Sequence, residues 1–150
     1  IRDRGESFPF AQSQFVEVRG RFSPDSRWVA YQSNESGTSE IYVQAFPGPG
    51  GKWQISTSGG SDPQWHPKGG KLYYLSPEMN IMTVDVELGE SFEAGIPEAL
   101  FQARLSPLTN LNTRYRVSPD GERFLLLGTL QSDATPPTTV VLNWTAELAR

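Results

Sequence analysis

The chain has 150 residues and a mass of 16.7 kDa, enough to bury a sizeable core in one domain. Its net charge of −4 and pI near 5.0 provide no general positive field, so we expect this segment to contact neither nucleic acid nor membrane. The absence of cysteine and the presence of a single histidine, His66, exclude disulfides, thiolate catalysis and histidine-cluster metal sites, and we expect no metal or cofactor.

Three short segments share a central proline and recur along the chain. They read FSPDS, WHPKG and VSPDG around Pro24, Pro67 and Pro119, which are 43 and 52 residues apart. Apolar residues follow five and seven positions after each proline, so each segment leads into a strand in the same register. This period indicates a repeated unit of a few strands.

The repeated segment has the residue types of a type I β-turn, in which proline presets φ and a serine side chain caps backbone N–H groups. Asp25 and Asp120 are therefore interpreted as turn residues rather than catalytic or metal-binding ones. His66 takes the serine position of the second turn and is expected to make a local hydrogen bond. The predicted turn residues are Ser23, Pro24, Asp25, His66, Pro67, Ser118, Pro119, Asp120 and Gly121.

The apolar runs between these turns divide the chain into three units, residues 16–57, 58–103 and 104–150. Sequential antiparallel strands at this spacing are typical of β-propeller blades. The fold class predicted is therefore all-β, a β-propeller segment of three four-stranded antiparallel blades. The predicted strands cover residues 16–22, 28–32, 40–44, 52–56, 62–65, 72–75, 81–86, 99–102, 113–117, 123–127 and 139–144.

The third unit lacks its fourth, outer strand, whereas one strand is left over near the N-terminus. Phe8–Gln12, within residues 1–15, has the same apolar-then-glutamine pattern as Leu100–Ala103. Three blades cannot close a ring, because propellers need four to eight. We expect the N-terminal strand to complete the last blade by exchange between two chains. The product is a homodimeric six-bladed ring, each chain supplying half.

The segments FSPD at 22–25, WVAY at 28–31 and IYV at 41–43 resemble the TolB-like, WD40-like (PD40) β-propeller repeats of bacteria. Residues 44–56 and 140–145 look like the C-terminal end of propellers that follow serine/threonine kinase domains, although no kinase motif is present here. The resemblance implies a ring of six or more blades used for protein interaction or sensing. It also implies an extracytoplasmic, periplasmic location and no catalytic residues.

Catalytic motifs are poorly matched. No Gly-x-Ser-x-Gly elbow occurs. The glycine-rich Gly48–Lys52 resembles a phosphate loop, but Trp53 stands where serine or threonine is required, so a hairpin loop is the better interpretation. Asp85 and Glu87 lie on one strand without an aromatic pocket, which is weak support for a glycosidase pair.

Polar residues recur three and five positions before each repeat proline, on the strand expected to be innermost. They are Arg19, Arg21, Asp62, Gln64, Arg114 and Arg116. Four arginines beside one channel are suited to bind a carboxylate or phosphate, because guanidinium groups bind such anions in two-point contacts. The alternative is that they form structural ion pairs with Glu17, Asp62 and neighbouring carboxylates.

The leading functional hypothesis is a non-catalytic module for protein or ligand recognition or sensing. Its partner, a protein or a small anion, would meet loops at residues 32–39, 58–61, 104–112 and 128–138. Two alternatives remain open: an accessory substrate-gating propeller of a prolyl-oligopeptidase-like hydrolase, and a purely structural oligomerisation unit. The full-length gene would distinguish these possibilities.

Overall fold

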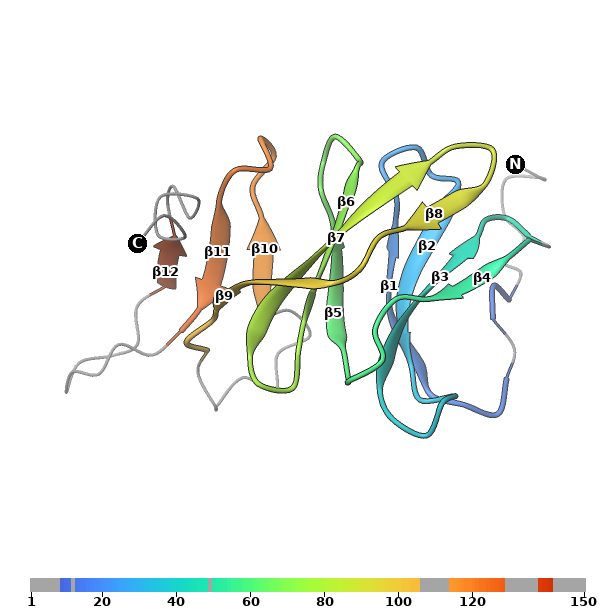
Figure 1. Ribbon diagram of the computed structural model, residues 1–150, viewed down its shortest axis with the longest axis horizontal. Helices are drawn as coiled ribbons and strands as arrows, with labels where there is room; N and C mark the ends of the chain where they lie inside the picture. Colours follow the sequence, from blue (N-terminus) through green and yellow to red (C-terminus); the bar gives the residue numbers. More distant parts are fainter. Residues whose placement is uncertain (1–8, 12, 49, 106–113, 129–137, 142–150) are drawn as a thin grey trace.

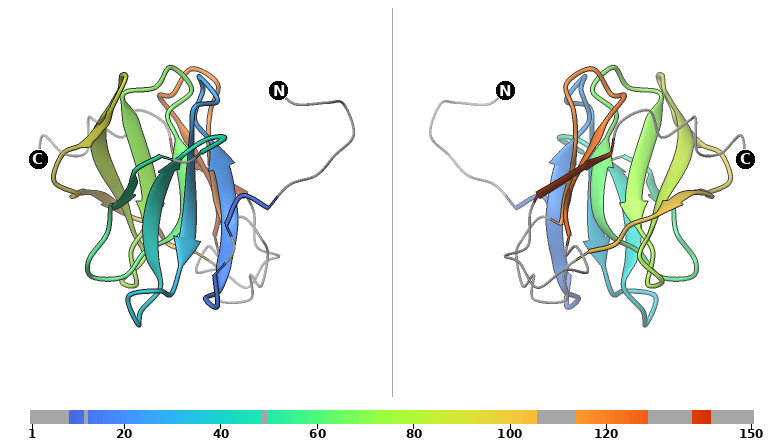
Figure 2. Two further views of the ribbon diagram at one scale, coloured as in Figure 1. Left: turned by 90° about the vertical axis from the view of Figure 1, so that its right-hand side faces the viewer. Right: turned by 90° about the vertical axis from the view of Figure 1, so that its left-hand side faces the viewer.

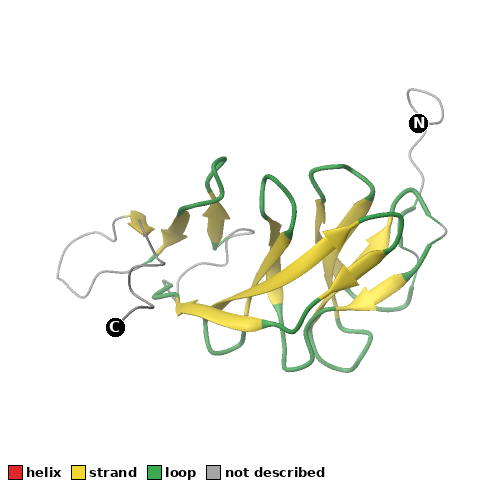
Figure 3. Ribbon diagram, turned by 45° about the horizontal axis from the view of Figure 1, so that its top comes forward, coloured by secondary structure: helices red, strands yellow, loops and turns green. Residues whose placement is uncertain are grey.

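The computed structural model describes residues 9–11, 13–48, 50–105, 114–128 and 138–141, with no side-chain description in the last range. All regular structure in these residues is strand (Figure 3). The strands form three antiparallel sheets that follow one another along the long axis (Figure 1). The described residues contain no helix long and apolar enough to cross a membrane.

The first sheet pairs its four strands in chain order, as predicted. The β2–β3 pair is its centre, with Tyr31 opposite Tyr42 in an unbroken register. These strands are rich in β-branched and aromatic residues, which pack well on a pleated surface. The strands are β1 (Glu17–Phe22), β2 (Trp28–Ser33), β3 (Glu40–Ala45) and β4 (Lys52–Gln54).

The second sheet has one strand more than predicted. Its strand β7 (Asn80–Leu88) is long enough to pair with β9 (Glu98–Gln102) near its start and with β8 (Phe92–Ala94) near its end. The sequence analysis missed β8, whose three residues are too few for a period-2 pattern. The strands β5 (Ser61–Trp65) and β6 (Lys71–Leu75) complete the sheet.

The third sheet has three strands, β10 (Tyr115–Val117), β11 (Phe124–Leu127) and β12 (Thr138–Val141). No fourth strand pairs with it among the described residues, and the expected lack of an outer strand in this unit stays a prediction. The remainder of the strand predicted over 139–144 lies outside the described residues.

Each pair of neighbouring sheets encloses its own core, and Figure 2 shows the sheets face to face. In the first core, the ring of Phe92 lies 5.5 Å from Trp28 and 5.2 Å from Trp53, centroid to centroid. In the second core, Phe124 meets Tyr73 at 5.1 Å in an edge-to-face arrangement, which aromatic pairs favour. The short β8 therefore closes the first core with a side chain that is only 2% exposed.

The structure of the single chain does not show the strand predicted near the N-terminus. Residues 9–11 of the expected strand are not in a strand, and residues 8 and 12 lie outside the described part. Phe10 packs on its own first sheet, 6.0 Å from Tyr31 and 5.9 Å from Phe46, because this buries the ring. Phe101 of β9, which belongs to the segment with the similar sequence pattern, packs on the third sheet, with its ring 5.3 Å from that of Phe124. Exchange of the segment between two chains stays a prediction.

Candidate functional site

The inner strands β1 and β5 each carry a bulge at the same position before the repeat proline. The β1–β2 register shifts between Val18 and Arg21, and the β5–β6 register shifts between Ser61 and Gln64. Within these bulges Arg19 and Asp62 adopt left-handed backbone conformations, with φ of 60° and 54°. Such φ values are uncommon outside glycine, and bulges redirect side chains, here toward the neighbouring strand.

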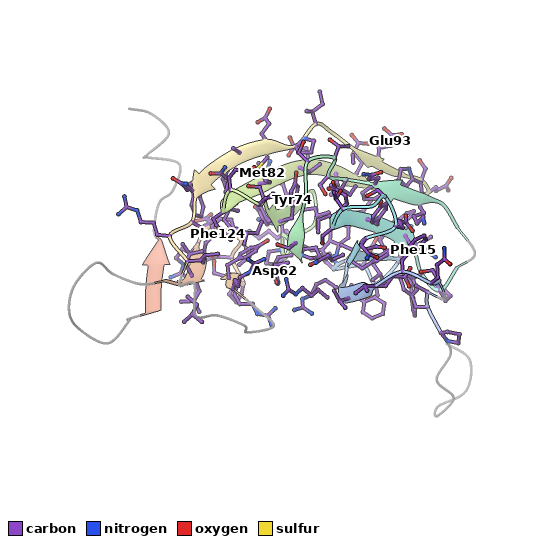
Figure 4. All side chains as sticks on the ribbon, turned by 90° about the horizontal axis from the view of Figure 1, so that it is seen from below. Phe15, Asp62, Tyr74, Met82, Glu93 and Phe124 are labelled. Atoms are coloured by element: carbon purple, nitrogen blue, oxygen red, sulfur yellow. The ribbon has the colours of Figure 1, made fainter. Side chains whose placement is uncertain are left out.

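One buried carboxylate joins all three sheets. Asp62 on β5 accepts Nη1 of Arg19 at 2.9 Å and Nη2 of Arg114 at 2.6 Å, one on each oxygen. The side chain of Asp62 is 2% exposed, against 28% for Arg19 and 18% for Arg114. Figure 4 shows Asp62 on the side of the molecule opposite to Glu93 of β8. For these two arginines, the structural ion pair is therefore the arrangement observed.

Among the described residues, the other two arginines, Arg21 and Arg116, have only neutral partners. Nη1 of Arg21 donates to the carbonyl of Gly20 at 3.2 Å, and Nη1 of Arg116 donates to Oε1 of Gln64 at 3.3 Å. The buried Nε of Arg21 has no hydrogen-bond partner among the described residues. Glu17, an expected alternative partner, forms no ion pair within the described part of the chain.

The pKa of Arg21 is affected by its burial and by the charges around it. Burial lowers the pKa of the Arg21 guanidinium, the nearby positive charge of Arg116 lowers it further, and Asp62 only partly opposes the change. Burial also raises the pKa of Tyr115 well above its ordinary value, with Asp62 adding to the increase. Within the described residues, Asp62 thus pairs with two of the four guanidinium groups, and the other two pair with no carboxylate. We call Arg19, Arg21, Arg114 and Arg116 the arginine cluster.

A pocket of about 490 Å³ opens beside the arginine cluster, and Arg19 and Arg114 form part of its wall. Its other walls come from the β2–β3 and β4–β5 loops with the strand ends beside them, and from Leu75 and Pro77 at the end of β6. Several of these residues fall within 32–39 and 58–61 of the predicted partner-binding loops. The lining residues are Arg19, Gln32, Thr38, Ser39, Glu40, Thr57, Ser58, Gly59, Gly60, Ser61, Leu75, Pro77 and Arg114.

A second buried carboxylate, Glu40, holds the pocket loops in place. Its oxygens accept Oγ1 of Thr38 at 3.1 Å, the backbone N–H of Gly59 at 2.9 Å and the hydroxyl of Ser56. Glu40 is 2% exposed. Sequence reasoning missed it, and its only signal was an acidic residue at the start of an apolar strand.

The three repeat turns have the same geometry. In each, the backbone N–H at the fourth position donates to the carbonyl at the first, at 2.9 Å. Asp25 accepts the hydroxyl of Ser23 at 2.6 Å and Nε of Arg27 at 2.9 Å. In the third turn, Asp120 accepts the hydroxyl of Ser118 and Nη2 of Arg123. These carboxylates cap turns.

In the second turn, Nδ1 of His66 accepts the backbone N–H of Lys68 at 3.1 Å. Burial lowers the pKa of His66, and the positive charges of Lys68 and Lys71 lower it further. The imidazole lies against Gly121 of the third turn, where an added Cβ would overlap it. His66 thus has a local packing role between two turns.

The remaining sequence candidates are dispersed. Asp85 forms a surface ion pair with Lys71, and its side chain is 78% exposed. Most of the predicted partner-binding loops at 104–112 and 128–138 lies outside the described residues. Within the described part, no group of three or more His, Asp or Glu side chains is placed to hold a metal.

Comparison with known proteins supports the fold. No family model and no curated protein matches the chain. Among solved structures, it is similar to a Bacteroides uniformis protein provisionally named a 6-phosphogluconolactonase, with a TM-score of 0.54 and 15% identity over 88% of this chain and 42% of that one. TolB from Acinetobacter baumannii matches with a TM-score of 0.40 and 16% identity over 89% and 43%.

The chain therefore spans less than half the length of these two structures. At 15% identity, the first likeness shows the fold alone. Together with the three successive antiparallel sheets, it identifies the chain as a segment of a β-propeller.

Proposed function

We propose that this propeller segment is a non-catalytic recognition module that binds an anionic group of its partner or ligand at Arg21 and Arg116. The observation that carries the proposal is that, among the described residues, Asp62 pairs with Arg19 and Arg114 alone, which leaves Arg21 and Arg116 on the same side of the sheets without a carboxylate partner. Carboxylate and phosphate are the groups that guanidinium binds best, through paired, charge-assisted hydrogen bonds.

The two roles within the arginine cluster differ. Arg19 and Arg114 are held by Asp62 and fix the relative positions of the sheets. Within the described part of the chain, Arg21 and Arg116 donate only to neutral oxygens and retain donor groups for a ligand. A bound anion would relieve the repulsion between these two charges, so binding is favoured although the chain as a whole is acidic.

The proposal of a binding role rather than catalysis is supported by what the candidate reactive groups do. Asp25 and Asp120 cap turns, Glu40 holds loops and His66 packs against Gly121. Each is occupied by a structural contact, and the two aspartates pair with arginines of their own turns.

Calorimetric titration with sulfate at low ionic strength tests the proposal. We expect millimolar or tighter binding by the wild-type chain and loss of at least tenfold in affinity in Arg21→Gln/Arg116→Gln. The matched control is Arg27→Gln/Arg123→Gln, because these arginines pair with turn aspartates. It should bind sulfate like the wild type. Equal sulfate affinity in the two double variants would refute the site.

A further inference from the structure

We propose that the pocket beside the arginine cluster binds the hydroxylated part of a small aliphatic acid whose carboxylate or phosphate lies on the cluster. This inference rests on the proposed anion site and adds the class of ligand. The pocket and the cluster are continuous, because Arg19 and Arg114 belong to both.

The pocket is built before any ligand arrives. The N–H of Gly60 donates to the carbonyl of Ser39 at 2.8 Å, and the hydroxyl of Ser39 donates back to the carbonyl of Gly60 at 3.3 Å. Glu40 accepts a hydrogen bond from the backbone N–H of Gly59. Gly59 has φ +90°, and a Cβ there would lie 2.4 Å from Pro77. The loop is therefore fixed between two sheets, which reduces the entropy lost on binding.

The lining of the pocket selects a hydroxylated ligand. Hydroxyl groups of Thr57 and Ser58 make no hydrogen bond with another described residue, and both residues are exposed on the pocket wall. Among the described residues, Nη1 of Arg114 donates only to the sulfur of Met79, at 3.8 Å. These groups offer donors and acceptors to ligand hydroxyls, which can serve as both.

The lining also argues against other ligands. None of the lining residues is aromatic, and the apolar part consists of Leu75 and Pro77. A nucleobase or other flat ring would find no side chain on which to stack, whereas an aliphatic chain fits beside a proline and a leucine. The volume of about 490 Å³ suits a small molecule.

The position of the charged end follows from the arginines. Arg19 at the pocket wall and Arg21 in the cluster both belong to β1, two positions apart across its bulge. A short aliphatic acid would place its charged end at Arg21 while its hydroxyls remain at Thr57 and Ser58. Gluconate, with one carboxylate and a hydroxylated chain, is a suitable probe.

Calorimetric titrations with gluconate, acetate and glucose separate the two parts of the site. We expect gluconate to bind at least tenfold more tightly than acetate and glucose. Thr57→Val should weaken gluconate binding about three- to tenfold and leave acetate unchanged. The matched control Thr83→Val, on β7 with a buried hydroxyl that lacks a described partner, should leave both unchanged.

The outcomes distinguish this inference from the proposed function. Equal affinity for gluconate and acetate, with both still dependent on Arg21 and Arg116, would overturn the hydroxyl-binding pocket and leave the anion site standing. Gluconate binding that survives Arg21→Gln/Arg116→Gln but falls in Thr57→Val would overturn the anion site. Tighter binding of adenosine monophosphate than of gluconate would overturn the aliphatic ligand class.

Discussion

Replacing Asp62 with asparagine should destabilise the fold, because it removes the negative charge and one of the two oxygens that accept the guanidinium groups. Asparagine tolerates the left-handed backbone found at this bulge, so the strand geometry is retained. The substitution leaves Arg19 and Arg114 without a counter-charge. Removing one partner of a buried ion pair costs about 3–5 kcal/mol. Because the arginines are 28% and 18% exposed, solvent screens part of this cost, and we expect a loss of about 2–3 kcal/mol.

Urea unfolding at pH 7 and low salt measures the change in the free energy of unfolding. The matched control is Asp85→Asn, since Asp85 is 78% exposed and pairs with Lys71 at the surface. It should cost at most about 1 kcal/mol. Adding sulfate should recover part of the loss in Asp62→Asn, because a ligand that binds only the folded state stabilises it by mass action.

Two results would refute this reasoning. A loss in Asp62→Asn as small as that in Asp85→Asn would show that the carboxylate does not hold the sheets together. A variant that is strongly destabilised yet gains nothing from sulfate, relative to chloride at equal ionic strength, would show that an anion cannot take the place of the lost charge.

Three further predictions concern the core, the turns and assembly. Phe92→Ala should lower the free energy of unfolding by about 3–5 kcal/mol in urea denaturation, and the exposed neighbour Glu93→Ala by less than about 0.5, since only Phe92 lies in the core. The hydrogen bond from Ser118 lowers the pKa of Asp120 from an ordinary 3.8 to about 2. The ionised Asp120 therefore stabilises the folded state fully above pH 3.8, and this stabilisation is lost as the pH falls toward 2. Over this pH window, the unfolding temperature of Asp120→Asn should fall less than that of the wild type. Light scattering of the wild-type chain should give the mass of a dimer, twice 16.7 kDa, and a variant that lacks residues 1–13 should give the mass of a monomer. A monomeric wild-type chain, or a dimer that persists after the deletion, would contradict strand exchange.

The repeat turns explain why most of the strands were predictable. Proline presets φ, serine and aspartate cap the turn, and the alternating strand after each turn keeps a single register. The predicted strands 28–32, 40–44 and 72–75 differ by at most one residue at each end from β2, β3 and β6. Local residue chemistry was therefore sufficient wherever a turn sets the register.

The features that escaped prediction depend on contacts distant in sequence. The bulges place Arg19 and Asp62 in left-handed conformations that neither residue favours locally, and the ion pair between them forms only when two sheets meet. Strand β8 exists because Phe92 fills a space between tryptophans of another sheet. Similarly, the pocket depends on Glu40 reaching Gly59, 19 positions further along. The six inner-strand polar residues were predicted as a group, but their division into paired and neutral-bonded arginines was not.

The placement of the tryptophans gives the chain an internal spectroscopic reporter. Trp28, Trp53 and Trp65 all belong to the first core, around Phe92, and Trp144 lies outside the described residues. The second core contains tyrosine and phenylalanine instead. Emission from the three clustered indoles therefore follows separation of the first two sheets, while far-ultraviolet circular dichroism follows all three. A denaturant midpoint that is lower by circular dichroism than by emission would reveal the third sheet loosening first.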